Sequence, residues 1–304
     1  MRNTSIAIIG APLDQGTGRR GVDMGPSAVR VANVFGRVAS LGYDVSDLGN
    51  APVAQAEMFA VGSAQAKYLP QIAETCGALA GMVEQAMDAG RSPIVLGGDH
   101  SIAAGSVAGV SAHFRRKNQK IGLIWVDAHA DMNTPETSPS GNVHGMPLAC
   151  CVGLGPPELA NLLGYAPKVN PRKTVLVGLR DVDVLEKGHV RETGVRAFTM
   201  RDIDERGLRS VMDEAFRIAT DDTAGFHLSL DMDWVDPQFA PGVGTPVRGG
   251  ATYREAHLAM ELICDNGRML SMEVVEVNPV IDEINRTADL AVEMIMSAMG
   301  KKIL

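Results

Sequence analysis

Residues 121–131 read Ile-Gly-Leu-Ile-Trp-Val-Asp-Ala-His-Ala-Asp, and this stretch indicates both the fold class and the place of a site. Its first part is an apolar, β-branched run, which is typical of a buried strand. The last part carries Asp127, His129 and Asp131, a metal-binding side chain at every second position. Because residues i, i+2 and i+4 of an extended chain point to one side, we expect all three to face one site. Solvated acids at a strand end would explain one such residue, but not three in register.

Two other apolar runs have the same design. Residues 93–96 lead into Gly97-Gly98-Asp99-His100, and residues 225–230 lead into Asp231-Met232-Asp233. In open α/β sheets, ligands bind beyond the carboxyl ends of the strands. Glu276 ends a fourth apolar run and is expected at the same edge. We therefore expect one site with these candidate metal ligands: His100, Asp127, His129, Asp131, Asp231 and Asp233.

The rest of the chain alternates strand-like and helix-like segments. Strands are expected at 5–10, 43–45, 93–96, 121–127, 174–178, 195–198, 225–231 and 269–276. Helices are expected at 27–41, 57–90 with a break near Pro70, 101–114, 146–152, 207–220, 253–265 and 289–299. This order predicts a parallel sheet with helices on both faces. No repeat, low-complexity segment or linker divides the chain, so residues 1–304 are expected to form a single domain.

Composition excludes several classes of partner. The net charge is −8 and basic residues form no long run, which argues against nucleic acid and anionic membranes as partners. The N-terminus lacks the features of a signal peptide, and no apolar run approaches the ~20 residues of a membrane helix. The four cysteines (Cys76, Cys150, Cys151 and Cys264) have no C-x-x-C spacing. Reduced, mostly buried thiols and a cytoplasmic location are expected.

A glycine-rich loop suggests a different class of protein. Residues 16–21 match G-x-G-x-x-G, the dinucleotide-binding fingerprint, with Asp44 or Asp47 as the acid for the ribose. That fingerprint requires its first glycine at the end of the strand and a helix that opens at once. Here the strand ends near Gly10, and Pro26 delays the next helix. We therefore expect a glycine-rich surface loop near the site. The alternative of a nucleotide-binding oxidoreductase would rest on this loop alone.

The ligand types indicate the chemistry. Four carboxylates and two imidazoles are too many for one ion, which favours a two-metal site with ions roughly 3.5–4 Å apart. Oxygen-rich ligation without thiolate favours Mn²⁺ over Zn²⁺. Water held between two cations ionises near neutral pH. We therefore predict metal-assisted hydrolysis at an electrophilic carbon, without a covalent intermediate. No glycine-cradled phosphate loop accompanies the ligands, which argues against a phosphatase.

Several motifs together resemble a known family. They are Arg20-Gly-Val-Asp-Met-Gly-Pro26, Gly97-Gly-Asp-His-Ser101, Asp127-Ala-His-Ala-Asp131, Ser140-Gly-Asn-Val-His-Gly145, Ser229-Leu-Asp-Met-Asp233 with Asp236-Pro237, Gly242-Val-Gly-Thr-Pro246 and Glu276-Val-Asn-Pro279. In this order they resemble the ureohydrolases, and within them the arginases. The resemblance implies a three-layer α/β/α fold with an eight-stranded, mostly parallel sheet. It also implies hydrolysis of L-arginine to L-ornithine and urea by a hydroxide that bridges two Mn²⁺ ions per subunit.

The resemblance also implies a role for each matching residue. One Mn²⁺ would bind His100, Asp127, Asp131 and Asp231, and the other Asp127, His129, Asp231 and Asp233, so that Asp127 and Asp231 bridge. Asp131 would relay a proton to the departing amine, and His144 would exchange protons with solvent. Glu276 would pair with the guanidinium group, with Thr245 in the adjacent loop and His129 beside the substrate. Asn133, Ser140 and Asn142 would bind the α-carboxylate, and Asp183, with Glu186, the α-amino group.

Some alternatives stay open at this point. An agmatinase or another guanidino hydrolase would share the metal site, but agmatine has no α-carboxylate. The Ser140-Gly-Asn142 run therefore favours arginine, and its neutral donors imply recognition by hydrogen bonds without an ion pair. Loss of activity in a metal-binding protein is disfavoured by the intact ligand set with His144 and Glu276. The run His129-Ala-Asp-Met-Asn133 departs from the Gly and Leu of related chains only at its spacers. A homohexamer is expected by resemblance to bacterial arginases, with a trimer as the alternative.

Overall fold

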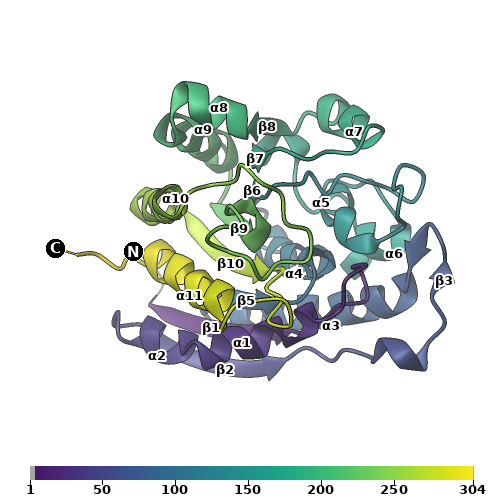
Figure 1. Cartoon of the computed structure of the whole chain (residues 1–304), viewed down its shortest axis with the longest axis horizontal. Helices are drawn as coiled ribbons and strands as arrows, with labels where there is room; N and C mark the ends of the chain where they lie inside the picture. The colour runs from purple at the N-terminus through teal and green to yellow at the C-terminus, as the bar shows by residue number, and fades with distance from the viewer. Residues whose placement is uncertain (1–3, 304) are drawn as a thin grey trace.

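Eight strands form one parallel sheet in the computed structural model, which describes residues 4–303 (Figure 1). The strand order is β2-β1-β5-β10-β9-β6-β7-β8, and every pairing in this sheet is parallel. The strands are β1 (Ser5–Ala11), β2 (Asp44–Asn50), β5 (Ser92–Gly97), β6 (Gly122–Val126), β7 (Thr174–Leu179), β8 (Arg196–Thr199), β9 (Phe226–Asp231) and β10 (Met269–Val275). The predicted α/β class with an eight-stranded parallel sheet is confirmed.

Helices cover both faces of the sheet and make three layers (Figure 1). Alternate strand residues face opposite layers, so Ile124 and Val126 of β6 join one apolar core and Leu123 and Trp125 the other. The first core includes α1 (Gly25–Val31), α2 (Val34–Ala39), α8 (Met200–Arg206), α9 (Leu208–Thr220), α10 (Tyr253–Asn266) and α11 (Arg286–Ala298). The second includes α3 (Leu69–Asp88), α4 (Ala103–Arg115), α5 (Pro147–Cys151) and α6 (Pro157–Ala160). Helix α7 (Glu186–Glu192) lies near the end of β7.

Two predicted helices differ in the structure. The helix expected at 27–41 is divided into α1 and α2, because Asn33 takes a left-handed conformation with φ of 62° and caps the second helix. The first third of the helix expected at 57–90 is wrong. A short antiparallel hairpin of β3 (Gly62–Ser63) and β4 (Ala66–Lys67) occupies this segment, after a 3₁₀ turn at Ala56–Met58. Pro70 lies in the first turn of α3 and starts that helix, since its fixed φ suits this position.

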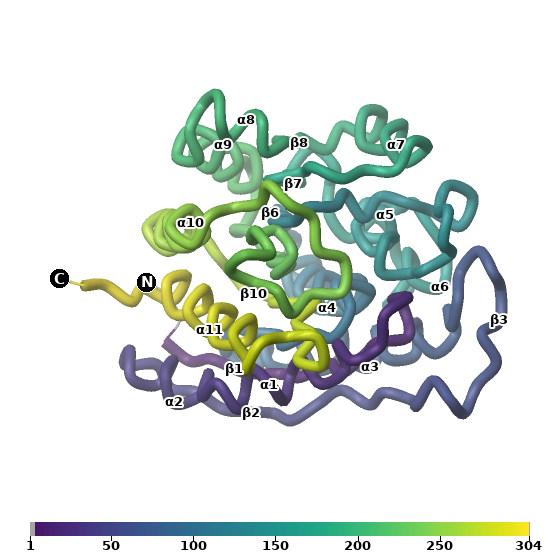
Figure 2. Tube along the Cα trace, viewed as in Figure 1, coloured from purple at the N-terminus to yellow at the C-terminus, as the bar shows by residue number. Residues whose placement is uncertain are grey.

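The strand order places the predicted site. Strands β5, β10, β9 and β6 are consecutive neighbours at the centre of the sheet, and their carboxyl ends lead to His100, Glu276, Asp231 and Asp127. These residues come from distant parts of the sequence, and only the order of the strands brings them together. Figure 2 follows the β3–β4 hairpin along the periphery, where the Lys67 backbone N–H donates to Gly141 O at 3.0 Å. The hairpin thus contacts the loop that precedes His144.

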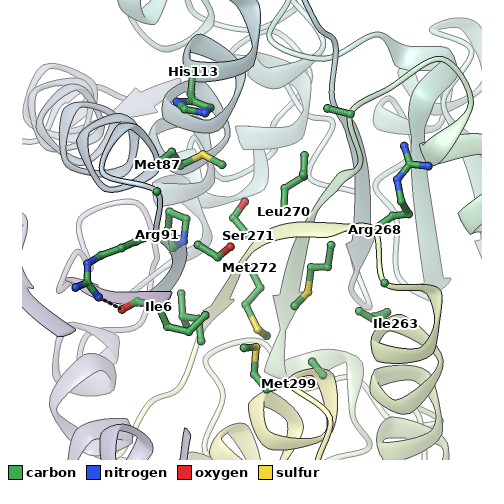
Figure 3. A pocket seen from close by; sticks show the side chains of 18 of the residues that line it. Ile6, Met87, Arg91, His113, Ile263, Arg268, Leu270, Ser271, Met272 and Met299 are labelled. Atoms are coloured by element: carbon green, nitrogen blue, oxygen red, sulfur yellow. Dashed lines mark hydrogen bonds between the residues drawn. The ribbon is translucent and has the colours of Figure 1, made fainter. Parts of the chain in front are cut away.

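The opposite edge of the sheet has a cavity of its own. Its volume is about 510 Å³, and Figure 3 shows Met87, Arg91, Arg268, Ser271 and Met272 among its lining side chains. It lies at the amino ends of the central strands, away from the predicted ligands. The four cysteines are free and buried, as expected. Among the helices of residues 4–303, none combines the length and the apolar character needed to cross a membrane.

Candidate active site

His100 lies at the centre of three carboxylates. Its Nδ1 atom is 3.1 Å from Asp127 Oδ2, 3.0 Å from Asp131 Oδ2 and 3.1 Å from Asp231 Oδ2. All four side chains are at most 8% exposed. The opposite ring nitrogen, Nε2, is 2.7 Å from Ser229 Oγ. The imidazole is thus held from behind, and Nδ1 faces the carboxylate oxygens.

A second cluster adjoins the first. His129 Nδ1 is 3.0 Å from Asp233 Oδ2 and 3.5 Å from Asp127 Oδ1. One ligand atom from each of His100, Asp127 and Asp231 lies within 4.8 Å of the other two, and the same holds for Asp127, His129 and Asp233. Asp127 belongs to both clusters. The structure therefore brings all six predicted ligands together and makes Asp127 the link between two cation-sized sites.

The donor set fits metal ions. His100 Nδ1 is buried and has no hydrogen-bond partner within residues 4–303, although three carboxylate oxygens surround it. Burial, with repulsion from Asp127, raises the pKa of Asp131 to about 6. Burial and the charge of Asp233 also raise the pKa of Asp231. Crowded buried carboxylates of this kind are stabilised by cations at their centre.

The local path of the chain differs from the predicted one. Strand β6 ends at Val126, so Asp127, His129 and Asp131 lie beyond it and do not converge by strand alternation. The chain turns instead, with the Asp127 carboxylate accepting the His129 N–H at 2.6 Å and Asp131 in a left-handed conformation with φ of 50°. Trp125 donates to Asp127 at 2.9 Å and its ring stacks on His100 at 4.2 Å. The three side chains do lie together, but the turn after β6, and not strand alternation, brings them there.

The two carboxylate oxygens of Glu276 differ in their hydrogen bonding. Oε1 accepts the His100 backbone N–H at 3.0 Å and is 3.0 Å from His144 Nδ1. Oε2 is buried and has no hydrogen-bond partner within residues 4–303. Burial favours the neutral acid, but the bond to His144 outweighs it and lowers the pKa of the Glu276 carboxyl. Burial likewise opposes an imidazolium at His144, yet the bond to Glu276 raises the pKa of His144 to about 9.

A small pocket of about 120 Å³ leads to the clusters. Asn133, Ser140, Asn142, His144, Asp183 and Thr245 are among its lining residues, and Glu276 lies next to His144. Asn133 donates to Asp183 at 2.9 Å, and Ser140 Oγ accepts the Asn142 N–H at 3.2 Å. The structure thus places the predicted substrate-contacting residues around one opening. Their contacts with a substrate stay predictions.

Two of the predicted contacts have partners in the protein itself. Thr245 Oγ1 donates to Asp233 Oδ2 at 3.0 Å, so this threonine also orients a candidate ligand. Glu186 accepts the N–H groups of Met132 at 2.8 Å and Asp183 at 3.0 Å, which ties the Asp183 loop to the segment after Asp131. Burial raises the pKa of Glu186 to about 7, even though both N–H groups favour its ionised form.

Two cations near the site were not predicted from the sequence. Lys67 of the hairpin donates from Nζ to Asn142 Oδ1 at 3.0 Å. Nothing in the sequence pairs these residues, because 75 positions separate them. Arg180 donates to the Asp233 carbonyl at 2.6 Å and to the Trp234 carbonyl at 3.1 Å. Arg180 directly follows β7, so the rule applied to the other strand ends could have found it.

The glycine-rich loop of residues 16–21 packs against the site. The Gly16 N–H donates to Asp99 at 2.8 Å, and Gly16 O accepts the His144 N–H at 3.1 Å. A Cβ atom at Gly16 would lie 2.1 Å from Ser101 Oγ, so only glycine allows this approach. No helix opens at this loop: a 3₁₀ turn begins at Val22 and α1 at Gly25. The loop lies near the site, as expected, and its geometry is not that of a dinucleotide fingerprint.

Comparisons with known proteins agree in one assignment. The model of the Arginase family matches residues 4–300. The arginase of Bacillus caldovelox is 50% identical over 300 residues, which cover 98% of this chain and 99% of that protein. Its solved structure has a TM-score of 0.94 at 49% identity, with both chains fully covered. The arginase of Entamoeba histolytica, solved with L-ornithine, has a TM-score of 0.89 at 33% identity and covers 99% of this chain and 100% of its own.

A parallel α/β/α sheet with buried His/Asp clusters at its carboxyl edge defines an α/β protein with a candidate metal-binding site. The matches over nearly the whole chain are more specific, and the chain belongs to the arginase family. The resemblance stated from the sequence motifs is thereby confirmed.

Proposed function

We propose that this protein hydrolyses L-arginine to L-ornithine and urea at a centre of two Mn²⁺ ions. The observation that carries the proposal is the buried, unpartnered Oε2 of Glu276 beside two His/Asp clusters. A buried carboxylate oxygen without a donor is costly unless a ligand supplies one. A guanidinium group offers N–H donors in a geometry that matches a carboxylate. The relatives named as arginases, at 47–50% identity, support the same substrate.

The clusters suit a pair of divalent ions. His100, Asp127, Asp131 and Asp231 would hold one ion, and Asp127, His129, Asp231 and Asp233 the other. Mn²⁺ accepts this mixture of carboxylate and imidazole ligands. The clusters contain no cysteine, whose thiolate would favour zinc. When bound, the two cations supply hydroxide at neutral pH by lowering the pKa of water. Trp125 and the apolar core behind it keep bulk water away from the inner side of the site.

Glu276 is suited to orienting the substrate. Its Oε1 is held by the His100 N–H and by His144, so the carboxylate cannot rotate freely and Oε2 keeps its direction. We propose that Oε2 accepts hydrogen bonds from the guanidinium group and places its carbon over the clusters. Thr245 and His129 line the adjoining wall, near Asp233. The group is thus positioned before the reaction, and little reorganisation is needed.

Asp131 and His144 would move protons. Asp131 Oδ2 lies inside the cluster, 3.0 Å from His100 Nδ1. There it could take the remaining proton of the hydroxide oxygen once that oxygen has bonded to the guanidinium carbon, and pass it to the amine as the C–N bond breaks. His144 lies at the pocket wall and its side chain is 17% exposed, so it can exchange protons with solvent. Two nearby cations would disfavour the imidazolium and bring the pKa of His144 from about 9 toward neutrality.

The outer pocket would recognise the amino-acid end of the substrate. Ser140, Asn142, Asn133 and Asp183 all line the opening, and Asn133 donates a hydrogen bond to Asp183. We propose that Asn133, Ser140 and Asn142 contact the α-carboxylate and that Asp183 contacts the α-amino group. Agmatine lacks the carboxylate and would leave donors unpaired, which disfavours the alternative of an agmatinase.

Urea release from L-arginine and agmatine, measured side by side, tests this proposal. The protein is first treated with a chelator and then assayed with and without added Mn²⁺. We expect no urea without metal, and kcat/KM for agmatine at least about 10³-fold below that for arginine, the loss of two or three bonds to a charged group. Equal turnover of the two substrates would refute the specificity. Full activity in the chelated protein would refute the metal centre.

A further inference from the structure

A buried glutamate lies behind the metal-binding clusters. Glu273 of β10 is 0% exposed and faces the core between the sheet and α4, which is otherwise mainly apolar. Its carboxylate accepts a hydrogen bond from Ser229 at 2.7 Å and another from Ser106 of α4. His227 Nε2 is 3.5 Å from Glu273 Oε1, the oxygen that accepts from Ser229. A buried carboxylate is expensive unless several donors surround it, so this arrangement calls for an explanation.

Ser229 connects this glutamate to His100. Its Oγ atom is 2.7 Å from Glu273 Oε1 and 2.7 Å from His100 Nε2. A hydroxyl group has a single proton to donate, and an ionised carboxylate can only accept. The Ser229 proton therefore points to Glu273, and a lone pair of Oγ points to His100. His100 must then carry a proton on Nε2, so that in the neutral imidazole, the form that binds a metal ion, Nδ1 is the nitrogen with the free lone pair.

Nδ1 is the atom that faces the cluster. It lies 3.0–3.1 Å from the oxygens of Asp127, Asp131 and Asp231. A metal ion binds only an unprotonated imidazole nitrogen, and the hydrogen bond on the other nitrogen selects the tautomer. We infer that Glu273 is a positioning residue, which acts through Ser229 to hold His100 in the tautomer that binds metal. This inference rests on the proposed metal centre, and it assigns Glu273 a task in that centre.

Other polar groups on the same core do not share this task. His227 Nδ1 is 2.7 Å from Ser271 Oγ, and Ser271 lines the cavity at the opposite edge of the sheet (Figure 3). Ser271 therefore reaches Glu273 through His227, and not through Ser229 or His100. Ser271 is a buried serine of β10, two residues from Glu273, but it is not between Glu273 and His100. Ser271→Ala is therefore a matched control for Ser229→Ala.

Mn²⁺ binding to the chelated protein tests the inference, with free Mn²⁺ measured by electron paramagnetic resonance. The wild type is expected to bind two ions, and His100→Asn identifies the site that contains His100. Glu273→Met and Ser229→Ala should each weaken that site about 10- to 100-fold, as is usual for partners that orient a ligand. The site with His129 and Asp233 should change little. Glu273→Gln keeps one acceptor oxygen and should recover part of the loss.

Two comparisons separate positioning from other effects. Ser229→Ala keeps the negative charge of Glu273, so its loss of affinity cannot come from removing a charge near the metal. The double variant Glu273→Met with Ser229→Ala should bind Mn²⁺ at this site no more weakly than the single variant with the lower affinity, because both substitutions act through one contact. Thermal unfolding of each chelated variant reports how far the fold is disturbed, and nitrogen NMR of the histidine rings reports the His100 tautomer directly.

The outcomes are distinct. Selective weakening by Ser229→Ala and Glu273→Met, with Ser271→Ala unchanged, supports the inference. Unchanged Mn²⁺ affinity in Ser229→Ala overturns it and leaves the metal centre intact. Equal weakening of both ion sites also overturns it, since that pattern indicates general disturbance. If the wild type binds no Mn²⁺, or if His100→Asn binds as many Mn²⁺ ions as the wild type with unchanged affinity, the metal centre with His100 is refuted, and the positioning role with it.

Discussion

Lys67 donates a hydrogen bond from Nζ to Asn142 Oδ1 at 3.0 Å, and this contact joins the β3–β4 hairpin to the wall of the proposed substrate pocket. The sequence alone implied neutral donors in this wall. The structure adds the ammonium group of Lys67, which contacts one of these donors, Asn142. A positive charge at this place would strengthen binding of a carboxylate and would also fix the orientation of the Asn142 amide.

Lys67→Met should therefore weaken the binding of arginine and leave the binding of agmatine unchanged. Loss of one charged hydrogen bond costs about 1.5–3 kcal/mol, so kcat/KM for arginine should fall roughly 10- to 100-fold. The change should appear mainly in KM, because the contact is remote from the reacting carbon. Steady-state assays of both substrates measure it. Lys120→Met removes an exposed lysine paired with Asp222 and serves as the control. An equal fall for both substrates would contradict a role at the carboxylate end.

Asp127 and Asp233 should differ in metal content when each is replaced by alanine. Asp127 belongs to both clusters, whereas Asp233 belongs to the one with His129. Asp127→Ala should therefore lose both Mn²⁺ ions, and Asp233→Ala should retain the ion beside His100. Elemental analysis of the purified variants counts the ions. A wild type with one tightly bound ion, or an Asp127→Ala protein with two, would refute the shared site.

His144→Asn should separate proton transfer from metal binding. His144 contacts Glu276 and is not part of either cluster, so both ions should remain. Turnover of arginine should fall about 10²- to 10⁴-fold, as is typical when an acid–base group is lost. Added imidazole should restore part of the rate. Metal content and urea release are measured on the same sample, and loss of an ion would make His144 a ligand instead.

Glu186→Gln should change how stability depends on pH. Burial raises the pKa of Glu186 from 4.5 to about 7 in the folded protein. A raised folded pKa gives stability that is complete below the unfolded value and is lost as pH rises through about 7. The glutamine has no such loss, so from pH 4.5 to 8 the variant should gain up to ~3 kcal/mol relative to wild type. Unfolding at both pH values with chelator present measures this difference, and a constant difference would contradict it.

The sequence by itself determined the type of fold and the chemistry of the candidate ligands. Apolar runs of strand length, separated by helical segments, are local patterns, and they predicted the parallel sheet. The candidate ligands directly follow these runs and could be identified in the same way, because ligands bind beyond the carboxyl ends of parallel strands. Local patterns failed at residues 59–68, where a hairpin replaces the expected helix.

Only the tertiary structure decided which of these residues meet. The strand order β5-β10-β9-β6 places His100 beside Asp231 and Asp127, and no local pattern contains that order. Left-handed backbone at Asp131 and Glu276 aims their carboxylates, and such conformations persist only where surrounding contacts impose them. The contacts of Lys67 with Asn142 and of Glu273 with Ser229 join positions 75 and 44 residues apart. Long-range packing determines which of these residues are in contact, since local sequence patterns do not specify contacts between distant positions.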